Sequence, residues 1–192
     1  LKNARDGKYG VGAFNILDYN SFKAVVDAAN ELNSPVITQI SVKTIKLWGY
    51  ETVATWYNQL AGNTSVPVAL HVDHCTDIEV IKNCIQAGWT SVMIDASSKP
   101  FEENLALSKY VVKLAAATNV SVEAELGEIG GVEEDIIVAE EDANLADPEK
   151  AKIFCKELDL AVFAPAIGTA HGVYKGVPKI AFDRIEEIAR ST

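Results

Sequence analysis

Histidine and acidic side chains recur where buried strands are predicted to end. The chain has three histidines, His71, His74 and His171, while Asp95 and Glu125 end two other apolar runs. Imidazole nitrogens and carboxylate oxygens are donors that zinc accepts, and a catalytic zinc site keeps one position open for substrate. Two imidazoles from different strands, together with these two carboxylates, therefore predict a site for Zn²⁺ or a similar divalent ion.

The strand that ends near His74 allows a second interpretation. Because side chains alternate along a strand, His71 and Asp73 point to one face, and His74 can swing toward them only if it lies on the loop beyond the strand. A structural hydrogen bond between His71 and Asp73 explains this peptide equally well. His171 alone is more typical of a loop residue, so it is the whole set that favours a metal.

Two further segments contain groups suited to catalysis. Glu123 and Glu125 lie on one face of a predicted strand, where clustered buried carboxylates suit metal binding or proton transfer. An internal network with Lys or Asn is the alternative. Between Gly168 and Gly176, glycines that expose backbone N–H groups precede Lys175. That combination suits a phosphate, although its specificity is low.

Six apolar runs of strand length alternate with amphipathic segments of helix length, which predicts an α/β fold with a parallel sheet and right-handed crossovers. The predicted strands are Val11–Asn15, Pro35–Ile40, Pro67–Val72, Ser91–Asp95, Ser121–Leu126 and Leu160–Ala164. The predicted helices are Asn20–Leu32, Thr52–Ala61, Ile78–Ala87, Glu102–Thr118, Glu149–Leu158 and Phe182–Arg190. The polar residues above collect at the carboxyl ends of the strands, where both open sheets and (β/α)₈ barrels bind ligands. One long segment, Gly127–Ala146, reads as irregular.

Composition narrows the class of protein. The 192 residues include 17 Lys and Arg against 27 Asp and Glu, a net charge of −10, which argues against a nucleic-acid or anionic-membrane surface. No apolar run approaches the ~20 residues that span a bilayer. No signal peptide is visible, but the chain begins at Leu1 rather than Met, which leaves open that its natural start is missing. Cys75, Cys84 and Cys155 form no CxxC pair, which favours free thiols in a reducing, cytoplasmic setting.

Taken together, these motifs resemble the class II, metal-dependent ketose-bisphosphate aldolases, a family that includes the fructose- and tagatose-1,6-bisphosphate aldolases. The resemblance runs over nearly the whole chain and is strong, because several matches occur in order. The matching segments are Gly12–Asn15, Pro67–His74, Ser91–Asp95, Pro100–Asn104, Ser121–Gly127, Gly130–Glu133 and Ala166–Gly172.

The resemblance implies a TIM (β/α)₈ barrel, of which residues 1–192 form a single, incomplete domain with about six βα units. It makes Asp73 and Glu133 the residues that transfer protons. The implied metal ligands are His74, His171, Asp95 and Glu125, and the implied substrate contacts are Asn15, Ser41, Gly172 and Lys175. The family's N-terminal start, its third histidine ligand and its last two strands have no counterpart in this sequence.

The implied reaction is the reversible cleavage of fructose 1,6-bisphosphate, or a related ketose 1,6-bisphosphate, to dihydroxyacetone phosphate and glyceraldehyde 3-phosphate. Zn²⁺ or another divalent metal is the implied cofactor, with a monovalent cation as a further candidate. A tagatose-bisphosphate aldolase and a non-catalytic barrel subunit of a two-subunit aldolase are the alternatives. By resemblance, we also expect a cytoplasmic homodimer or homotetramer without nucleic-acid or membrane partners.

Overall fold

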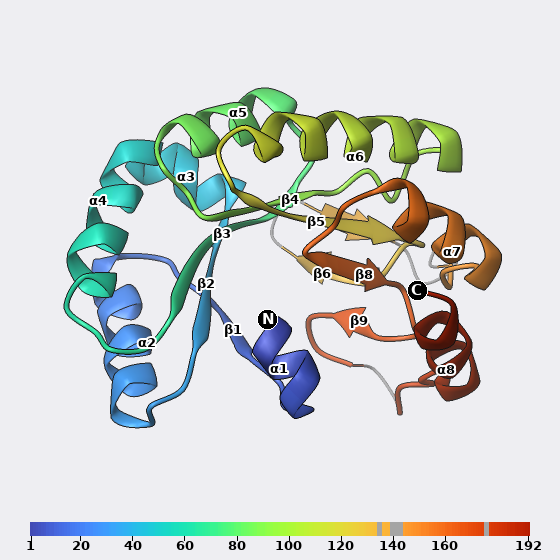
Figure 1. Ribbon diagram of the computed structural model, residues 1–192, viewed down its shortest axis with the longest axis horizontal. Coiled ribbons are helices and arrows are strands. Elements are labelled where there is room, and N and C mark those ends of the chain that lie inside the picture. The colour runs from blue at the N-terminus through green and yellow to red at the C-terminus, as the bar shows by residue number, and fades with distance from the viewer. Residues whose placement is uncertain (134–135, 139–143, 175–176) are drawn as a thin grey trace. The chain divides into compact units, whose positions relative to one another are not determined.

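The computed structural model describes residues 1–133, 136–138, 144–174 and 177–192, except the side chains of residues 132, 133 and 136–138. The chain divides into two compact units. The first unit contains Leu1–Met93 and Ala117–Ser121, and the second contains Ile94–Ala116 and Val122–Thr192. Figure 1 shows the elements of both.

The first unit is built on parallel strands in the order β1-β2-β3-β4. Helices α2 and α3 pack on β2, and helices α4 and α5 pack on β3 (Figure 1). The elements are α1 (Lys2–Gly7), β1 (Gly12–Asn15), α2 (Tyr19–Glu31), β2 (Val36–Ser41), α3 (Val42–Trp48), α4 (Tyr50–Ala61), β3 (Val68–Cys75), α5 (Ile78–Gln86) and β4 (Ser91–Ile94).

Side-chain alternation in β2 separates a buried face from a polar one. Val36, Thr38 and Ile40 are buried, while the residues between them are only partly buried. The buried face continues through Leu70 and Val72 of β3, both fully buried. The hydrophobic effect therefore fixes which face of this sheet meets the helices.

Helix termini follow the signals that the sequence contains. Asp77 caps α5 by accepting a hydrogen bond from the backbone N–H of Glu79 at 2.8 Å, and Gly88 follows the helix at φ +85°. Asp147 caps α7, and Pro148 occupies its first turn. The predicted first residues of these helices, Ile78 and Glu149, agree with the structure to within one residue, and the caps satisfy the otherwise unpaired N–H groups of each first turn.

The second unit contains a parallel pair of strands, β5 and β8, and a smaller sheet in the order β7-β6-β9. Phe154 of α7 is fully buried and packs between Phe101 and Phe163, with ring centroids 6.3 and 5.9 Å away. The elements are α6 (Phe101–Ala116), β5 (Ser121–Leu126), β6 (Gly130–Glu133), β7 (Ile136–Val138), α7 (Pro148–Glu157), β8 (Val162–Pro165), β9 (Ala170–His171) and α8 (Phe182–Ser191).

The α/β architecture with parallel strands is confirmed, and the predicted strands and helices agree with the structure to within about three residues at each end. The expectation that Gly127–Ala146 is irregular throughout is wrong, since β6 and β7 pair antiparallel inside it. Strands of four and three residues are too short to leave a periodic pattern. The single domain and the count of six βα units stay predictions.

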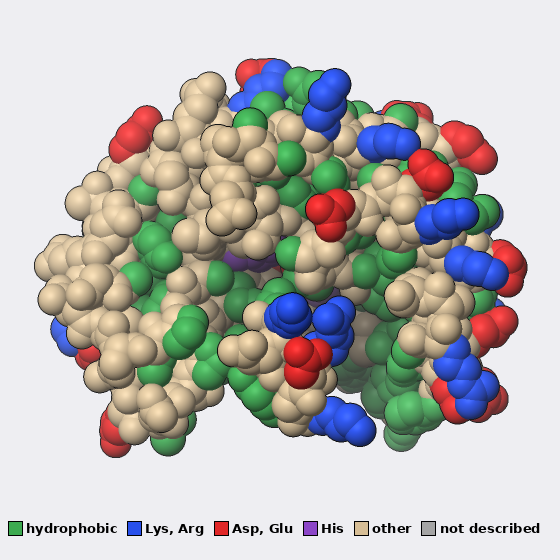
Figure 2. Space-filling model, viewed as in Figure 1, with side chains coloured by type: hydrophobic (Ala, Val, Ile, Leu, Met, Phe, Trp, Pro, Cys, Tyr) green, Lys and Arg blue, Asp and Glu red, His purple; other side chains and the backbone are tan. Residues whose placement is uncertain are grey.

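Charged side chains of both signs are interspersed on the face shown in Figure 2. None of the described helices combines the length and apolar character needed to cross a membrane.

Replacement of Phe22 by alanine in the full-length protein should lower the free energy of unfolding by about 3–5 kcal/mol, because it leaves a cavity in the buried face of α2. Leu32→Ala is the matched control, because Leu32 directly follows the same helix and is 75% exposed. Its expected change in the free energy of unfolding is below about 0.5 kcal/mol. Urea unfolding of both variants measures the difference. Equal midpoints for the two would contradict the packing described here.

Candidate active site

The carboxyl ends of β1, β2 and β3 carry a row of polar residues. In the parallel register Asn15 pairs with Gln39, Gln39 pairs with His71, and Ser41 pairs with Asp73. Paired residues of neighbouring strands point to the same face. The first unit therefore brings three of the predicted site residues, Asn15, Ser41 and Asp73, to one edge and one face of the sheet.

His71 is the most buried polar residue of this row, at 2% exposure. Its Nδ1 lies 2.8 Å from Ser91 Oγ, and its Nε2 lies 3.8 Å from Asp73 Oδ1. The prediction that His71 and Asp73 share a face is confirmed. The predicted hydrogen bond between them is wrong in this structure, because 3.8 Å exceeds hydrogen-bond distance and leaves an electrostatic contact.

Burial, with a smaller contribution from the proximity of His74, lowers the pKa of His71 to about 4. Protonation would place a cation where water cannot solvate it. The imidazole of His71 is therefore neutral at pH 7, with one N–H donor and one acceptor nitrogen.

His74 lies inside β3, one residue before its end, so the expectation that it follows the strand is wrong. Its φ of +43° explains the difference, since a left-handed residue interrupts the regular alternation without ending the strand. Non-glycine residues rarely adopt this conformation, and where they do, local strain is often associated with function.

Ser41 also has a structural role at the start of α3. Its Oγ accepts a hydrogen bond from the backbone N–H of Thr44 at 3.2 Å, which caps the helix. Asn15 is exposed at the end of β1. Their contacts with substrate stay predictions.

The second unit holds two buried carboxylates close together. Asp95 is 7% exposed and Glu125 is 2% exposed, and an oxygen of one lies within 4.8 Å of an oxygen of the other. The backbone N–H and hydroxyl of Ser97 donate to Asp95 Oδ1 at 3.1 and 2.6 Å. Two buried carboxylates at this distance repel each other unless a cation or a proton lies between them, so this donor set fits a divalent metal.

His171 lies on β9, against the hairpin formed by β6 and β7. Its register partner is Gly131, which has φ +119°, and a Cβ at Gly131 would lie 2.8 Å from His171 N. Only glycine allows this approach. His171 is not part of the carboxylate cluster among the described residues.

The remaining predicted residues surround this segment. Glu133 ends β6, where its backbone pairs with Ile136, but its side chain lies outside the described part of the chain. Gly172 is exposed directly after β9. Lys175 lies outside the described residues.

Two hydrogen bonds connect parts of the loop that carries His171. The backbone N–H of Ala181 donates to Ile167 O at 2.9 Å, and that of Ala170 donates to the Tyr174 hydroxyl at 3.0 Å. The first bond brings the segment after β8 close to the start of α8, so the two ends of the loop that carries His171 lie near each other.

Two serines were missed as candidate residues. Ser91 contacts His71, and Ser97 holds Asp95. The Asp-x-Ser spacing of 95 and 97 is a local turn signal that could have identified Ser97. Ser91 and His71 come from different strands, so no spacing in the sequence reveals their contact.

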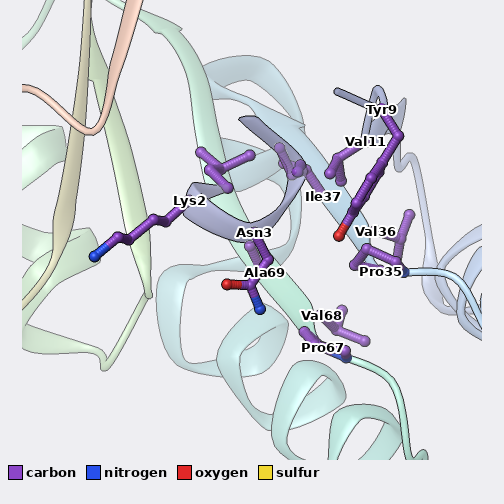
Figure 3. A pocket seen from close by; sticks show the side chains of 12 residues that line it. Lys2, Asn3, Tyr9, Val11, Pro35, Val36, Ile37, Pro67, Val68 and Ala69 are labelled. Carbon is purple, nitrogen blue, oxygen red and sulfur yellow. The ribbon is translucent and has the colours of Figure 1, made fainter. Parts of the chain in front are cut away.

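A cavity of about 330 Å³ in the first unit lies away from these groups (Figure 3). It is lined by residues of α1 and by the amino ends of β2 and β3, including Val36 and Val68. The polar row occupies the opposite ends of the same strands. The cavity is therefore not the candidate site.

Comparisons with known proteins agree with the chemistry of these groups. The family described as "Fructose-bisphosphate aldolase class-II" matches residues 1–192. The chain is similar to a fructose-bisphosphate aldolase from Helicobacter pylori, with 46% identity over all of this chain and 63% of the relative. It is also similar to a sulfofructosephosphate aldolase from Alkalicoccus urumqiensis, with 40% identity over all of this chain and 67% of that protein.

The chain belongs to the class II fructose-bisphosphate aldolase family. Among solved structures it resembles the YdjI aldolase from Escherichia coli K12, with a TM-score of 0.85 and 30% identity over 99% of this chain and 66% of that one. The fructose-bisphosphate aldolase from Campylobacter jejuni gives a TM-score of 0.79 and 26% identity, over 98% of this chain and 63% of that one. The predicted family is confirmed, and class II aldolases are metal-dependent.

This class II family member spans about two thirds of the length of the relatives that it matches.

The low pKa of His71 makes stability depend on pH. An unfolded histidine titrates near 6.5, so between pH 6.5 and about 4 the unfolded state binds a proton that the folded state excludes. The contribution of His71 to stability is therefore fully present above pH 6.5 and falls by about 3 kcal/mol as the pH drops toward 4. Urea unfolding in EDTA, compared between wild type and His71→Gln in the full-length protein, measures it. Parallel pH curves for the two proteins would contradict this assignment.

Replacement of Gly131 by alanine should separate the β6–β7 hairpin from β9, because the new Cβ collides with the His171 backbone and φ +119° is strained for alanine. Hydrogen exchange at the β6 and β9 amides should become at least about 10-fold faster, equivalent to about 1.4 kcal/mol of lost local stability. Gly10→Ala is the matched control, because a Cβ there meets nothing within 4 Å. Unchanged exchange in Gly131→Ala would rule out the close packing.

Proposed function

We propose that the full-length protein containing this chain is a fructose-bisphosphate aldolase. It would cleave fructose 1,6-bisphosphate reversibly to dihydroxyacetone phosphate and glyceraldehyde 3-phosphate. The match of the class II family over residues 1–192 carries this proposal. The polar groups at the carboxyl ends of β1–β3 support it, because these strand ends are the ligand-binding edge of an α/β fold.

We further propose that both units belong to one (β/α)₈ barrel. The parallel strands in each unit and the likeness to solved aldolases support this arrangement. In such a barrel the carboxyl ends of all strands meet at one rim.

The residues that would hold the metal are His74, His171, Asp95 and Glu125. Imidazole donors favour Zn²⁺ over Mg²⁺, and two buried carboxylates lower the net charge of the site. When bound, the ion supplies Lewis-acid polarisation of the substrate carbonyl. A monovalent cation near the phosphate is a further candidate.

Asp73 is the proposed base for the cleavage direction. Its carboxylate accepts the proton of the C4 hydroxyl while the C3–C4 bond breaks, which releases the aldehyde. The bonding electron pair remains on C3 of the dihydroxyacetone phosphate half. Glu133 then delivers a proton to that carbon. In the synthetic direction each residue performs the reverse transfer.

Substrate orientation is assigned to residues beside these groups. Asn15 and Ser41 would contact the sugar from the ends of β1 and β2. Gly172 and Lys175 would contact a phosphate, since an exposed backbone N–H and an ammonium are both suited to an anion. Correct placement of C3 and C4 between Asp73 and Glu133 would account for much of the rate enhancement.

A sulfofructose phosphate is a second candidate substrate, because the Alkalicoccus urumqiensis relative at 40% identity is named for it. A sulfonate would replace one phosphate of the bisphosphate, with no change at the bond that breaks. The tagatose isomer is a third candidate, since it differs at one stereocentre.

The proposed enzyme acts as a homodimer or homotetramer in the cytoplasm. A reducing compartment is consistent with its cysteines, since Cys75, Cys84 and Cys155 form no disulfide with one another.

Cleavage of fructose 1,6-bisphosphate by the full-length protein should be abolished by EDTA and restored by Zn²⁺. Asp73→Asn should lower kcat by about 10²–10⁴-fold, the usual contribution of a general base. Glu79→Gln is the control, since the Glu79 side chain is 72% exposed on α5. Activity that survives both EDTA and Asp73→Asn would overturn the mechanism. The kcat/KM values for the fructose, tagatose and sulfofructose substrates would identify the preferred one.

A further inference from the structure

We propose that His71 is a positioning residue that orients the Asp73 carboxylate, with Ser91 holding the imidazole in place. This inference rests on the proposed function, since it assigns a role to a residue beside the proposed base. Nothing in the proton transfers described above requires His71 itself.

The placement of His71 points to this role. His71 and Asp73 are two residues apart on β3, so both side chains project from the same face of the strand. The side chain of His71 is 3% exposed and that of Asp73 is 11% exposed, with Nε2 and Oδ1 3.8 Å apart. A carboxylate with so little contact with water is oriented mainly by its protein neighbours.

Ser91 fixes the ring from the neighbouring strand. Its Oγ lies 2.8 Å from His71 Nδ1, a normal hydrogen-bond distance. The strands are joined at the same level, because Leu70 N donates to Thr90 Oγ1 at 2.8 Å and Thr90 N donates to Leu70 O at 3.2 Å. The imidazole is therefore held by the side chain of a strand residue and not by a loop.

The proton arrangement follows from this anchor. A neutral imidazole carries one N–H, and a serine hydroxyl can either donate or accept. When Ser91 donates to Nδ1, the ring proton is on Nε2 and faces Asp73 Oδ1. The positive end of that N–H bond attracts the carboxylate and leaves the other oxygen, Oδ2, to accept the substrate proton. The 3.8 Å separation can shorten to a hydrogen bond when substrate binds, as catalytic hydrogen bonds often do.

A positioning role predicts a particular kinetic pattern. Misplacement of a catalytic group by about 1 Å costs up to about 10²-fold in rate without weakening ground-state binding. Loss of the Nε2 donor should therefore lower kcat and leave KM nearly unchanged. A merely structural histidine would change stability and the amount of folded enzyme, not kcat per folded site.

Two amide variants of the full-length, zinc-loaded protein separate the two ring nitrogens. His71→Gln places an N–H donor near the Nε2 position, whereas His71→Asn reaches only the Nδ1 position. Zinc content, KM and kcat are measured with fructose 1,6-bisphosphate. We expect kcat within about 3-fold of wild type for His71→Gln and about 10- to 100-fold lower for His71→Asn, with KM within 2-fold and zinc unchanged.

Ser91 provides the second test if His71→Asn does not fold. Ser91→Ala should lower kcat by about 3- to 10-fold, whereas Ser91→Thr, which keeps the hydroxyl, should not. A wild-type kcat in both His71→Asn and Ser91→Ala overturns the inference. Zinc loss in proportion to lost activity also overturns it, because His71 would then act on the metal site.

Nitrogen NMR of the imidazole in the metal-free full-length protein tests the inference even without activity. The expected state at pH 7 is neutral His71 with its proton on Nε2. A proton on Nδ1 or a charged ring overturns the inference. Wild-type protein without aldolase activity that nevertheless shows the Nε2–H state would instead contradict the proposed function.

Discussion

The alternation of side chains along the parallel strands β1–β3 is the constraint on which the candidate site depends. In β2 and β3 one face is buried against helices and is mostly apolar, with Ile40, Leu70 and Val72 fully excluded from water. The strands cannot turn over without exposing that face. The register of the parallel strands then determines which polar residues are neighbours. It places Asn15, Gln39 and His71 side by side and Ser41 beside Asp73.

The little-exposed polar residues His71 and Asp73 of β3, and Asp95 of the second unit, each have a nearby polar partner. His71 and Asp73 are close to each other, with His71 also bonded to Ser91, while Asp95 is held by two bonds from Ser97. Each of these contacts compensates for lost hydration. Each also restricts the orientation of a side chain that could transfer a proton or bind a metal. Stability and preparation for chemistry therefore arise from the same interactions.

Much of this arrangement could be predicted from the sequence. Continuous apolar runs located the strands, and amphipathic segments of helix length located the helices that begin at Ile78 and Pro148. The position of His74 could not be predicted, because a left-handed residue inside a strand leaves no trace in hydrophobic periodicity. Nor could the contact between Ser91 and His71, which depends on the register of two strands, or the short strands β6 and β7. The metal ligands and substrate contacts named from the family resemblance remain predictions.

The left-handed backbone at His74 restricts which side chains can evolve at that position. Asparagine, aspartate and glycine tolerate positive φ, whereas β-branched residues such as valine do so only with strain. The residues that adopt this backbone conformation with the least strain thus offer a metal an oxygen ligand atom, as asparagine and aspartate do, or no ligand atom, as in glycine. Under the proposal that His74 binds the metal, loss of the imidazole would leave harder oxygen donors or none, so the backbone would limit which metals the site could bind.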